Sequence, residues 1–188
     1  MPAIDVYGEV SDKLVEGMML HSDHADLFDF LGLKGFKRLH EYGYLHDTGN
    51  YRMIHRYAIN HLGMIPPQGR QERPTSLDAY MGRDRMDVAE GERRESVEGS
   101  ITAWVMWERE TKAAYQRAWE TLTRIGEVAA ARPIEKLIKD VDRELKKAER
   151  LHIRIKATGY DMGHIMEMQG DMHDKYREKI RCVGERIC

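Results

Sequence analysis

Apolar residues recur every three or four positions along most of the chain, which is the spacing of one face of an α-helix. The first such segment carries Tyr7, Val10, Leu14, Met18 and Ala25 at this spacing. The pattern predicts five helices, over about residues 4–31, 36–61, 96–126, 133–157 and 162–183. Helices with one apolar face pack together to bury that face, so the pattern predicts an all-α protein.

The lengths of the connections predict how these helices are arranged. Gly32–Gly35 is a short break, and short connections join antiparallel helices. Residues 68–94 are rich in Arg, Asp, Gly and Pro, and so long a connection in a compact bundle predicts a crossover. Ala129–Arg132 reads as a tight link before Pro133, which suits the first turn of a helix. We therefore expect one domain over residues 1–188: a four-helix bundle with a long crossover between helices two and three, and a fifth C-terminal helix.

The composition excludes several classes of protein. A charged fraction of 33% with a formal net charge of −2 is untypical of a nucleic-acid binder. No apolar run approaches the roughly 20 residues that cross a bilayer, and the N-terminus lacks the features of a signal peptide, so we expect no membrane partner and a cytoplasmic location. The cysteines, Cys182 and Cys188, form no disulfide framework. Nine His residues make metal binding worth testing.

The apolar stripe of the second predicted helix is interrupted by His40, Asp47, Asn50 and His61. Each unpaired buried polar group costs a few kcal/mol, and a buried charge costs more. Either mutual hydrogen bonds or a bound ion should therefore compensate these side chains.

Polar residues of the other helices fall at similar heights in the bundle. With a rise of about 1.5 Å per residue, His21 and Asp47 both lie about 20 Å from the Gly32–Gly35 turn, and Glu108 reaches a comparable depth. Glu149 and His152 are three positions apart, so they share a helix face and can reach one ion. The predicted metal ligands are therefore His21, Asp47, Glu108, Glu149 and His152. Carboxylates and imidazoles together suit Fe, Mn or Zn.

Several segments resemble ferritins. Phe28 to Phe36, Asp47-x-x-Asn50, Tyr57 and the exit from Gly63 to Pro66 are similar to the first helical hairpin of that family. Leu20-His21-x-x-His24 and Leu39-His40-Glu41 resemble pieces of the Dps-type mini-ferritins. The crossover, Trp107-Glu108, Glu149-x-x-His152 and a fifth helix extend the resemblance over most of the chain.

The resemblance implies a ferritin-like fold and a di-iron site formed by Asp47, Glu108, Glu149 and His152, with Glu108 between the two ions. The chain departs from the family pattern at Asn50, where ferritins have His, and His21 stands in for a Glu on the first helix. The resemblance also implies iron storage or detoxification by a ferroxidase-type oxidoreductase, and a homo-oligomer, either a dimer or a larger shell.

A second interpretation keeps the fold without the chemistry. In this alternative the chain is a non-catalytic scaffold or interaction protein, whose Asp47, Asn50, Glu108, Lys112 and His152 form a closed hydrogen-bonded network. Lys112 lies one helical turn after Glu108 and could neutralise it. Apolar residues beyond one internal stripe predict self-association in either case: Leu27, Phe30, Leu31, Tyr42, Leu45 and Tyr57.

Overall fold

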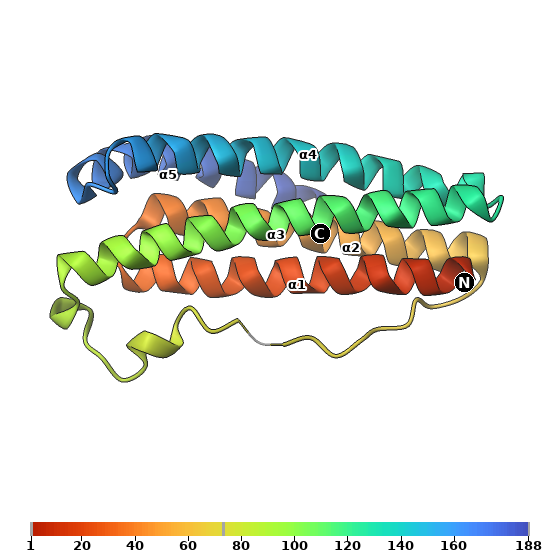
Figure 1. Ribbon diagram of the computed structural model, residues 1–188, viewed down its shortest axis with the longest axis horizontal. Coiled ribbons are helices and arrows are strands. Elements are labelled where there is room, and N and C mark those ends of the chain that lie inside the picture. Colours follow the sequence, from red (N-terminus) through yellow and green to blue (C-terminus); the bar gives the residue numbers. More distant parts are fainter. Residues whose placement is uncertain (1, 73, 188) are drawn as a thin grey trace.

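The computed structural model describes residues 2–72 and 74–187, and this part of the chain is helical with no strand. Its long helices are α1 (Ala3–Phe30), α2 (Lys34–Tyr57), α3 (Glu90–Arg124), α4 (Val128–Ala157) and α5 (Met162–Ile187), shown in Figure 1. A π-helical turn, Ala58–Leu62, prolongs α2, and two 3₁₀ turns, Asp78–Tyr80 and Arg85–Asp87, lie in the long connection before α3. The predicted all-α class with five helices is confirmed.

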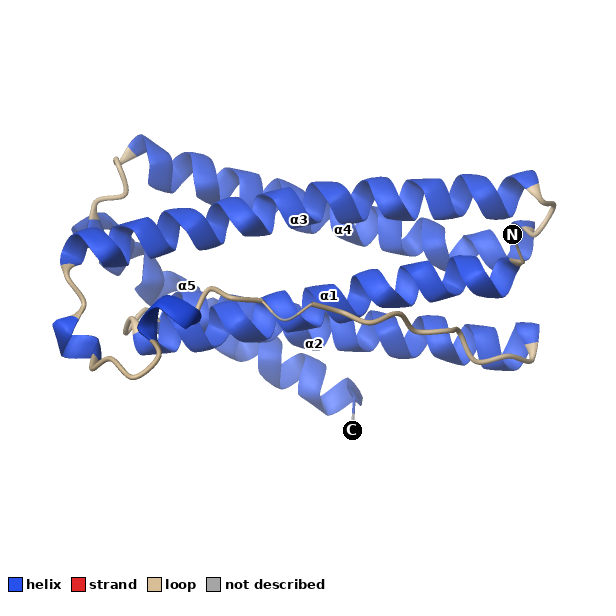
Figure 2. Cartoon of the chain, turned by 60° about the horizontal axis from the view of Figure 1, so that its bottom comes forward, coloured by secondary structure: helices blue, strands red, loops and turns tan. Residues whose placement is uncertain are grey.

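The helices form two antiparallel pairs. α1 packs on α2, and α3 packs on α4, while α1 also contacts α3. The segment between α2 and α3 runs back along the whole length of the bundle beside α1 (Figures 1 and 2), so α2 and α3 point in the same direction. This arrangement is the long crossover that the length of the connection predicts. α5 returns along the bundle and packs mainly on α2.

The turn between α3 and α4 lies earlier than the sequence pattern predicts. Ala129–Arg132, expected as a link, belongs to α4, and the chain reverses around Gly126, whose φ of 85° is in the left-handed region. Alanine is the strongest helix former, and Ala129 to Ala131 extend the helix by one turn. Pro133 therefore lies inside α4, beyond the first turn that suits proline, and the carbonyl of Ala129 loses its helical hydrogen-bond donor.

Among the described residues, the buried core has three apolar clusters and one layer of polar side chains. One of the clusters, which contains Leu39 and Trp104, adjoins the polar layer. A second cluster includes Tyr7, Leu14, Ile54, Leu122 and Ile134, and a third includes Phe28, Leu33, Phe36, Ile101 and Ile155. Each fully buried side chain of this kind stabilises the fold by about 1.5–3 kcal/mol. The side chains buried in the polar layer include His21, His24, His40, Asp47 and Glu108.

Some of the apolar residues from which self-association was predicted are covered within the chain itself, whereas Phe30, Tyr42, Leu45 and Tyr57 are half-buried. Leu27 and Leu31 are buried in the core, and the ring of Tyr42 lies 5.6 Å from that of Tyr176 on α5. α5 therefore covers part of the surface on which that prediction rested, and the oligomeric state stays a prediction. None of the described helices is long and apolar enough to cross a membrane.

Candidate functional site

A small cavity of about 30 Å³ lies in the polar middle layer, between α1, α2, α3 and α4. Each of these four helices contributes to its wall, and most of the polar side chains of the layer face it. Its polar lining residues are His21, Tyr42, His46, Asp47, Asn50, Trp104, Trp107, Glu108, Thr111, Tyr115, Asp140 and Glu144. The cavity therefore joins three of the predicted ligands, His21, Asp47 and Glu108.

Asp47 is the central carboxylate on the α2 side of the cavity. It is 8% exposed, and its Oδ2 atom has no hydrogen-bond partner among the described residues. His46 Nδ1 lies 3.9 Å from Asp47 Oδ1, and His21 Nε2 lies 4.0 Å from Oδ2. Burial raises the pKa of Asp47 well above its usual range, and the nearby Glu144 raises it further. An uncompensated negative charge is therefore unfavourable at this position.

Two glycines allow α1 and α2 to approach closely at this height. A Cβ on Gly17 would stand 2.4 Å from Asp47 Oδ2 and 2.5 Å from the Trp107 ring. A Cβ on Gly43 would stand 2.6 Å from His21 Nε2. Real Cβ atoms do not come this close to their neighbours, so only glycine at these positions leaves room for Asp47 and His21 in the polar layer.

Glu108 is the carboxylate that α3 contributes. It is 3% exposed, and its Oε1 atom accepts a hydrogen bond of 2.9 Å from Trp104 Nε1. Burial raises the pKa of Glu108 well above its usual range, and the charges of Asp47 and Glu144 raise it further, against smaller opposing effects of the Trp104 hydrogen bond and Lys147. The charges of neighbouring carboxylates thus raise the cost of ionising Asp47 and Glu108.

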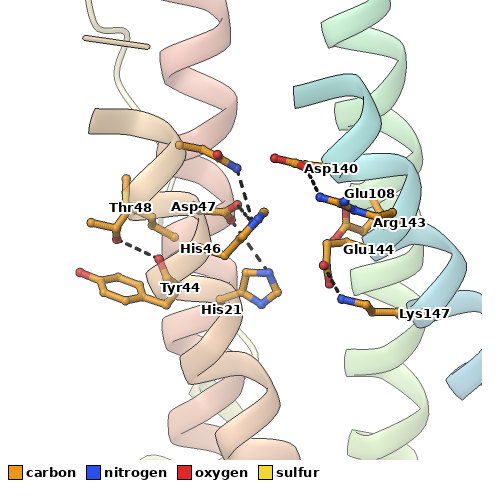
Figure 3. A network of polar contacts seen from close by, with 12 residues as sticks. His21, Tyr44, His46, Asp47, Thr48, Glu108, Asp140, Arg143, Glu144 and Lys147 are labelled. Atoms are coloured by element: carbon orange, nitrogen blue, oxygen red, sulfur yellow. Dashed lines mark hydrogen bonds and ion pairs between the residues drawn. The ribbon is translucent and has the colours of Figure 1, made fainter. Parts of the chain in front are cut away.

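α4 completes the site with Asp140 and Glu144, neither of which the sequence analysis selected. Figure 3 shows them opposite His46 and Asp47, together with the two cations that pair with them. Arg143 pairs with Asp140, and Lys147 Nζ donates to Glu144 Oε1 at 2.5 Å. The spacing gives only a weak signal: Asp140 follows the buried Leu137 by three residues and Glu144 follows the buried Val141 by three, which places both at the edge of the apolar stripe.

A group of three buried imidazoles lies beside the cavity. His21 Nδ1 and His40 Nδ1 share a hydrogen bond of 2.9 Å, and the His24 ring lies 4.9 Å from that of His40. Neither His24 nitrogen has a partner among the described residues. Burial lowers the pKa of His21 to about 3 and that of His24 to about 4, and it lowers the pKa of His40 as well. All three rings are therefore neutral at pH 7.

The structure does not bring Glu149 and His152 to the cavity. Glu149 accepts a hydrogen bond of 2.7 Å from Arg109, and His152 Nε2 lies 3.2 Å from the hydroxyl of Tyr160. Glu149 follows Glu144 by five residues, which is about 7.5 Å farther along the helix. Lys112 pairs with Asp142 at 2.5 Å rather than with Glu108, so the expected neutralisation of Glu108 by Lys112 is wrong.

With the side chains in these positions, the described part of the chain contains no group of three or more His, Cys, Asp or Glu that could hold a metal ion. The donor types around the cavity nevertheless match the preference of Fe, Mn and Zn for carboxylate oxygen and imidazole nitrogen. Asp47 Oδ2 is buried without a hydrogen-bond partner among the described residues. To bind the same ion as Asp47, Glu144 would have to break its ion pair with Lys147 and turn into the cavity.

Comparisons with known proteins assign no family to the chain. No protein-family model, no curated protein and no solved structure matches it.

Proposed function

We propose that the chain binds one divalent transition-metal ion, with iron the first candidate, in the cavity of the polar layer. Asp47, Glu108 and Glu144 are the proposed oxygen ligands, and His46 is the proposed nitrogen ligand. The observation that carries this proposal is the placement of four carboxylates around one small cavity, three of them buried: Asp47, Glu108 and Asp140 are buried, and Glu144 is half-buried.

The size of the cavity favours an ion over an organic substrate. Its volume of about 30 Å³ exceeds the roughly 10–15 Å³ that a cavity needs to hold one water molecule. Ligand pockets for organic molecules usually enclose about 300 Å³ or more. The cavity therefore suits an ion with at most a small inorganic ligand.

The electrostatics favour a cation. Burial and repulsion between carboxylates raise the pKa values of Asp47 and Glu108. Both groups are therefore costly to ionise as long as no cation is bound beside them. A divalent ion reverses this preference, because it stabilises the carboxylate form of every ligand that it contacts. Buried carboxylates at such a cost are retained where they serve a function more readily than where they serve packing alone.

The geometry supports one ion rather than the pair that the ferritin resemblance implies. The second ion was expected to bind Glu149 and His152, which are engaged by Arg109 and Tyr160. The long-crossover bundle and its carboxylate layer support a ferritin-like relationship as part of this proposal. Oxidation of a single bound ferrous ion by oxygen is the activity to be tested for, in keeping with iron storage or detoxification.

A metal-free scaffold is the second candidate, because ion pairs within the chain already neutralise the two carboxylates that α4 contributes. Arg143 neutralises Asp140, and Lys147 neutralises Glu144. If these pairs are the final state of the site, the polar layer serves to fix the register of the helices. The two candidates make opposite predictions for metal binding.

Equilibrium dialysis against Fe²⁺ under anaerobic conditions, with Mn²⁺ and Zn²⁺ in parallel, distinguishes them. We expect one ion per chain for the wild type and a loss of affinity of about tenfold or more for Glu108→Gln and Asp47→Asn. Glu110→Gln is the matched control, because Glu110 lies two residues away on α3 and is exposed. Wild-type protein that takes up no metal, or Glu108→Gln protein that binds as tightly as wild type, would establish the scaffold.

A further inference from the structure

A second, larger recess is lined by the end of α2 and the start of α4. These two helix ends lie at the same end of the bundle (Figure 1). This groove has a volume of about 790 Å³, within the range of pockets that hold small organic ligands. It shares no lining residue with the polar cavity. It is lined by Gly49, Arg52, Met53, Arg56, Tyr57, Asn60, His61, Ala129, Arg132, Pro133 and Lys136.

The charge of the groove is entirely positive. Four of its eleven lining residues are Arg or Lys, and none is Asp or Glu. The whole chain has 30 Lys and Arg against 32 Asp and Glu, so this one-sided lining does not follow from the composition. A concave surface lined by charges of one sign focuses the electric field and attracts ligands of the opposite sign.

Three of these cations have no carboxylate within ion-pair distance in the described part of the chain: Arg56, Arg132 and Lys136. Lys136 Nζ donates a hydrogen bond to the sulfur of Met53, at 3.5 Å. Neighbouring lysines on α4 behave differently, since Lys139 pairs with Glu135 and Lys146 pairs with Asp142. These three side chains therefore form no ion pair that a ligand would have to break, although Arg132 is near enough to Glu135 to lower the pKa of that carboxyl.

The groove combines this cationic rim with apolar side chains. Met53, Tyr57, Ala129 and Pro133 supply the apolar lining. The Tyr57 ring is held between Tyr7, at 5.7 Å, and His61, at 4.4 Å, so this wall is packed rather than loose. The π-helical turn Ala58–Leu62 forms part of the same wall, and π-helical turns are frequent at functional sites.

We propose that this groove binds a small phosphate-bearing ligand with a planar, largely apolar body, of the nucleotide class. Arg56 and Arg132 have the planar, forked donors that match phosphate oxygens, and Lys136 adds a third positive charge to the lining. The apolar lining accommodates the body of the ligand. This site stands independently of the metal proposal, because the two sites share no residue.

Binding of ATP, measured by isothermal titration calorimetry without divalent metal, tests the proposal, with tripolyphosphate and adenosine as the two halves of the ligand. We expect ATP to bind more tightly than either half. Arg56→Glu and Lys136→Glu should each weaken ATP binding by about tenfold or more, because each replaces an attraction by a repulsion. Lys139→Glu is the matched control: it makes the same change of charge on α4, outside the groove.

The proposal is overturned if wild-type protein fails to bind ATP at about 1 mM. It is also overturned if Lys139→Glu weakens binding as much as Lys136→Glu, since attraction would then follow net charge alone. Equal affinity for ATP and tripolyphosphate would overturn the role of the apolar lining. Circular dichroism checks that each variant is folded, and all three substituted side chains are exposed, so the fold should tolerate them.

Discussion

Lys147 holds Glu144 in an ion pair of 2.5 Å at the edge of a cavity that also contains Asp47 and Glu108. The ammonium group is close enough to oppose the rise that burial causes in the pKa of Glu108 and to add to the fall that burial causes in the pKa of His46. It therefore supplies, from the chain itself, part of the positive charge that a metal ion would bring. Metal binding through Glu144 has to displace this lysine.

The first prediction concerns that competition. Lys147→Gln should tighten Fe²⁺ or Zn²⁺ binding by several-fold, because the carboxylate of Glu144 no longer has to be released from a cation. Lys146→Gln is the control, since Lys146 pairs with Asp142, which does not line the cavity. Competition with a chromophoric chelator measures both affinities. Weaker binding by Lys147→Gln would mean that Lys147 positions Glu144 rather than competing for it.

A second prediction follows from the raised pKa of Glu108. At pH values above the ordinary range of glutamate, the unfolded state loses this proton more easily than the folded state does, so stability falls as pH rises. Glu108→Gln removes the titration and keeps an oxygen that can accept from Trp104 Nε1. In the presence of a chelator, this variant should melt about 3 °C or more above wild type at pH 7.5. The two proteins should melt alike near pH 4, where both states of the wild type are protonated.

If Glu108→Gln instead melts below wild type at pH 7.5, Glu108 is stabilised as a carboxylate by its surroundings alone. Ionised Glu108 would then be stable in its buried position, and it would need no cation beside it.

The third prediction concerns the buried histidines at acidic pH. Their pKa values are lowered in the folded state, so the unfolded state binds protons first as pH falls below about 6.5. Stability should therefore decrease as pH falls from 6.5 towards 4, by up to about 1.4 kcal/mol per pH unit for each such group. His24→Phe should flatten this dependence, because the new ring packs among Phe28 and His40 without titrating.

Urea unfolding between pH 7.5 and 4.5 measures both slopes. Asp47 and Glu108 contribute with the opposite sign in wild type and variant alike, so the difference between the two proteins isolates His24. Equal slopes would show that His24 is not buried as a neutral ring.

A fourth prediction separates two glycines of similar helical context. Gly17→Ala should destabilise the protein by about 1–3 kcal/mol, because the new Cβ would collide with Asp47 and Trp107. Gly49→Ala should be neutral or stabilising by up to about 1 kcal/mol, since no atom lies within 4 Å of its Cβ position and alanine favours the helix. Chemical denaturation gives both values. A harmless Gly17→Ala would mean that the two helices are farther apart at the polar layer.

Much of the fold was predictable because the residues that end and cap helices stand where the apolar spacing also stops and starts. The left-handed glycines at 32, 63 and 159 end helices where the pattern ends them, and Asp161 accepts from the backbone of His164 at the start of α5, as a helix cap does. The start of α4 was not predictable from Pro133, because proline is also tolerated a little inside a helix that begins with alanines.

The candidate site was predictable on α1, α2 and α3 but not on α4. His21, Asp47 and Glu108 replace apolar residues at the centre of a stripe, where burial follows from spacing alone. Asp140 and Glu144 lie at the edge of the α4 stripe, where a charged residue usually faces solvent. These two side chains reach the wall of the cavity because α4 packs against α3 and makes few contacts with α2.

The most direct test of the metal proposal is the anomalous scattering of a crystal grown with Zn²⁺ or Fe²⁺. We predict one peak per chain in the cavity, at about 2.0–2.3 Å from oxygens of Asp47 and Glu108, with Glu144 turned inward from Lys147. A map with no peak in the cavity at full metal occupancy elsewhere, or with the Lys147–Glu144 pair unchanged beside an empty cavity, would contradict it.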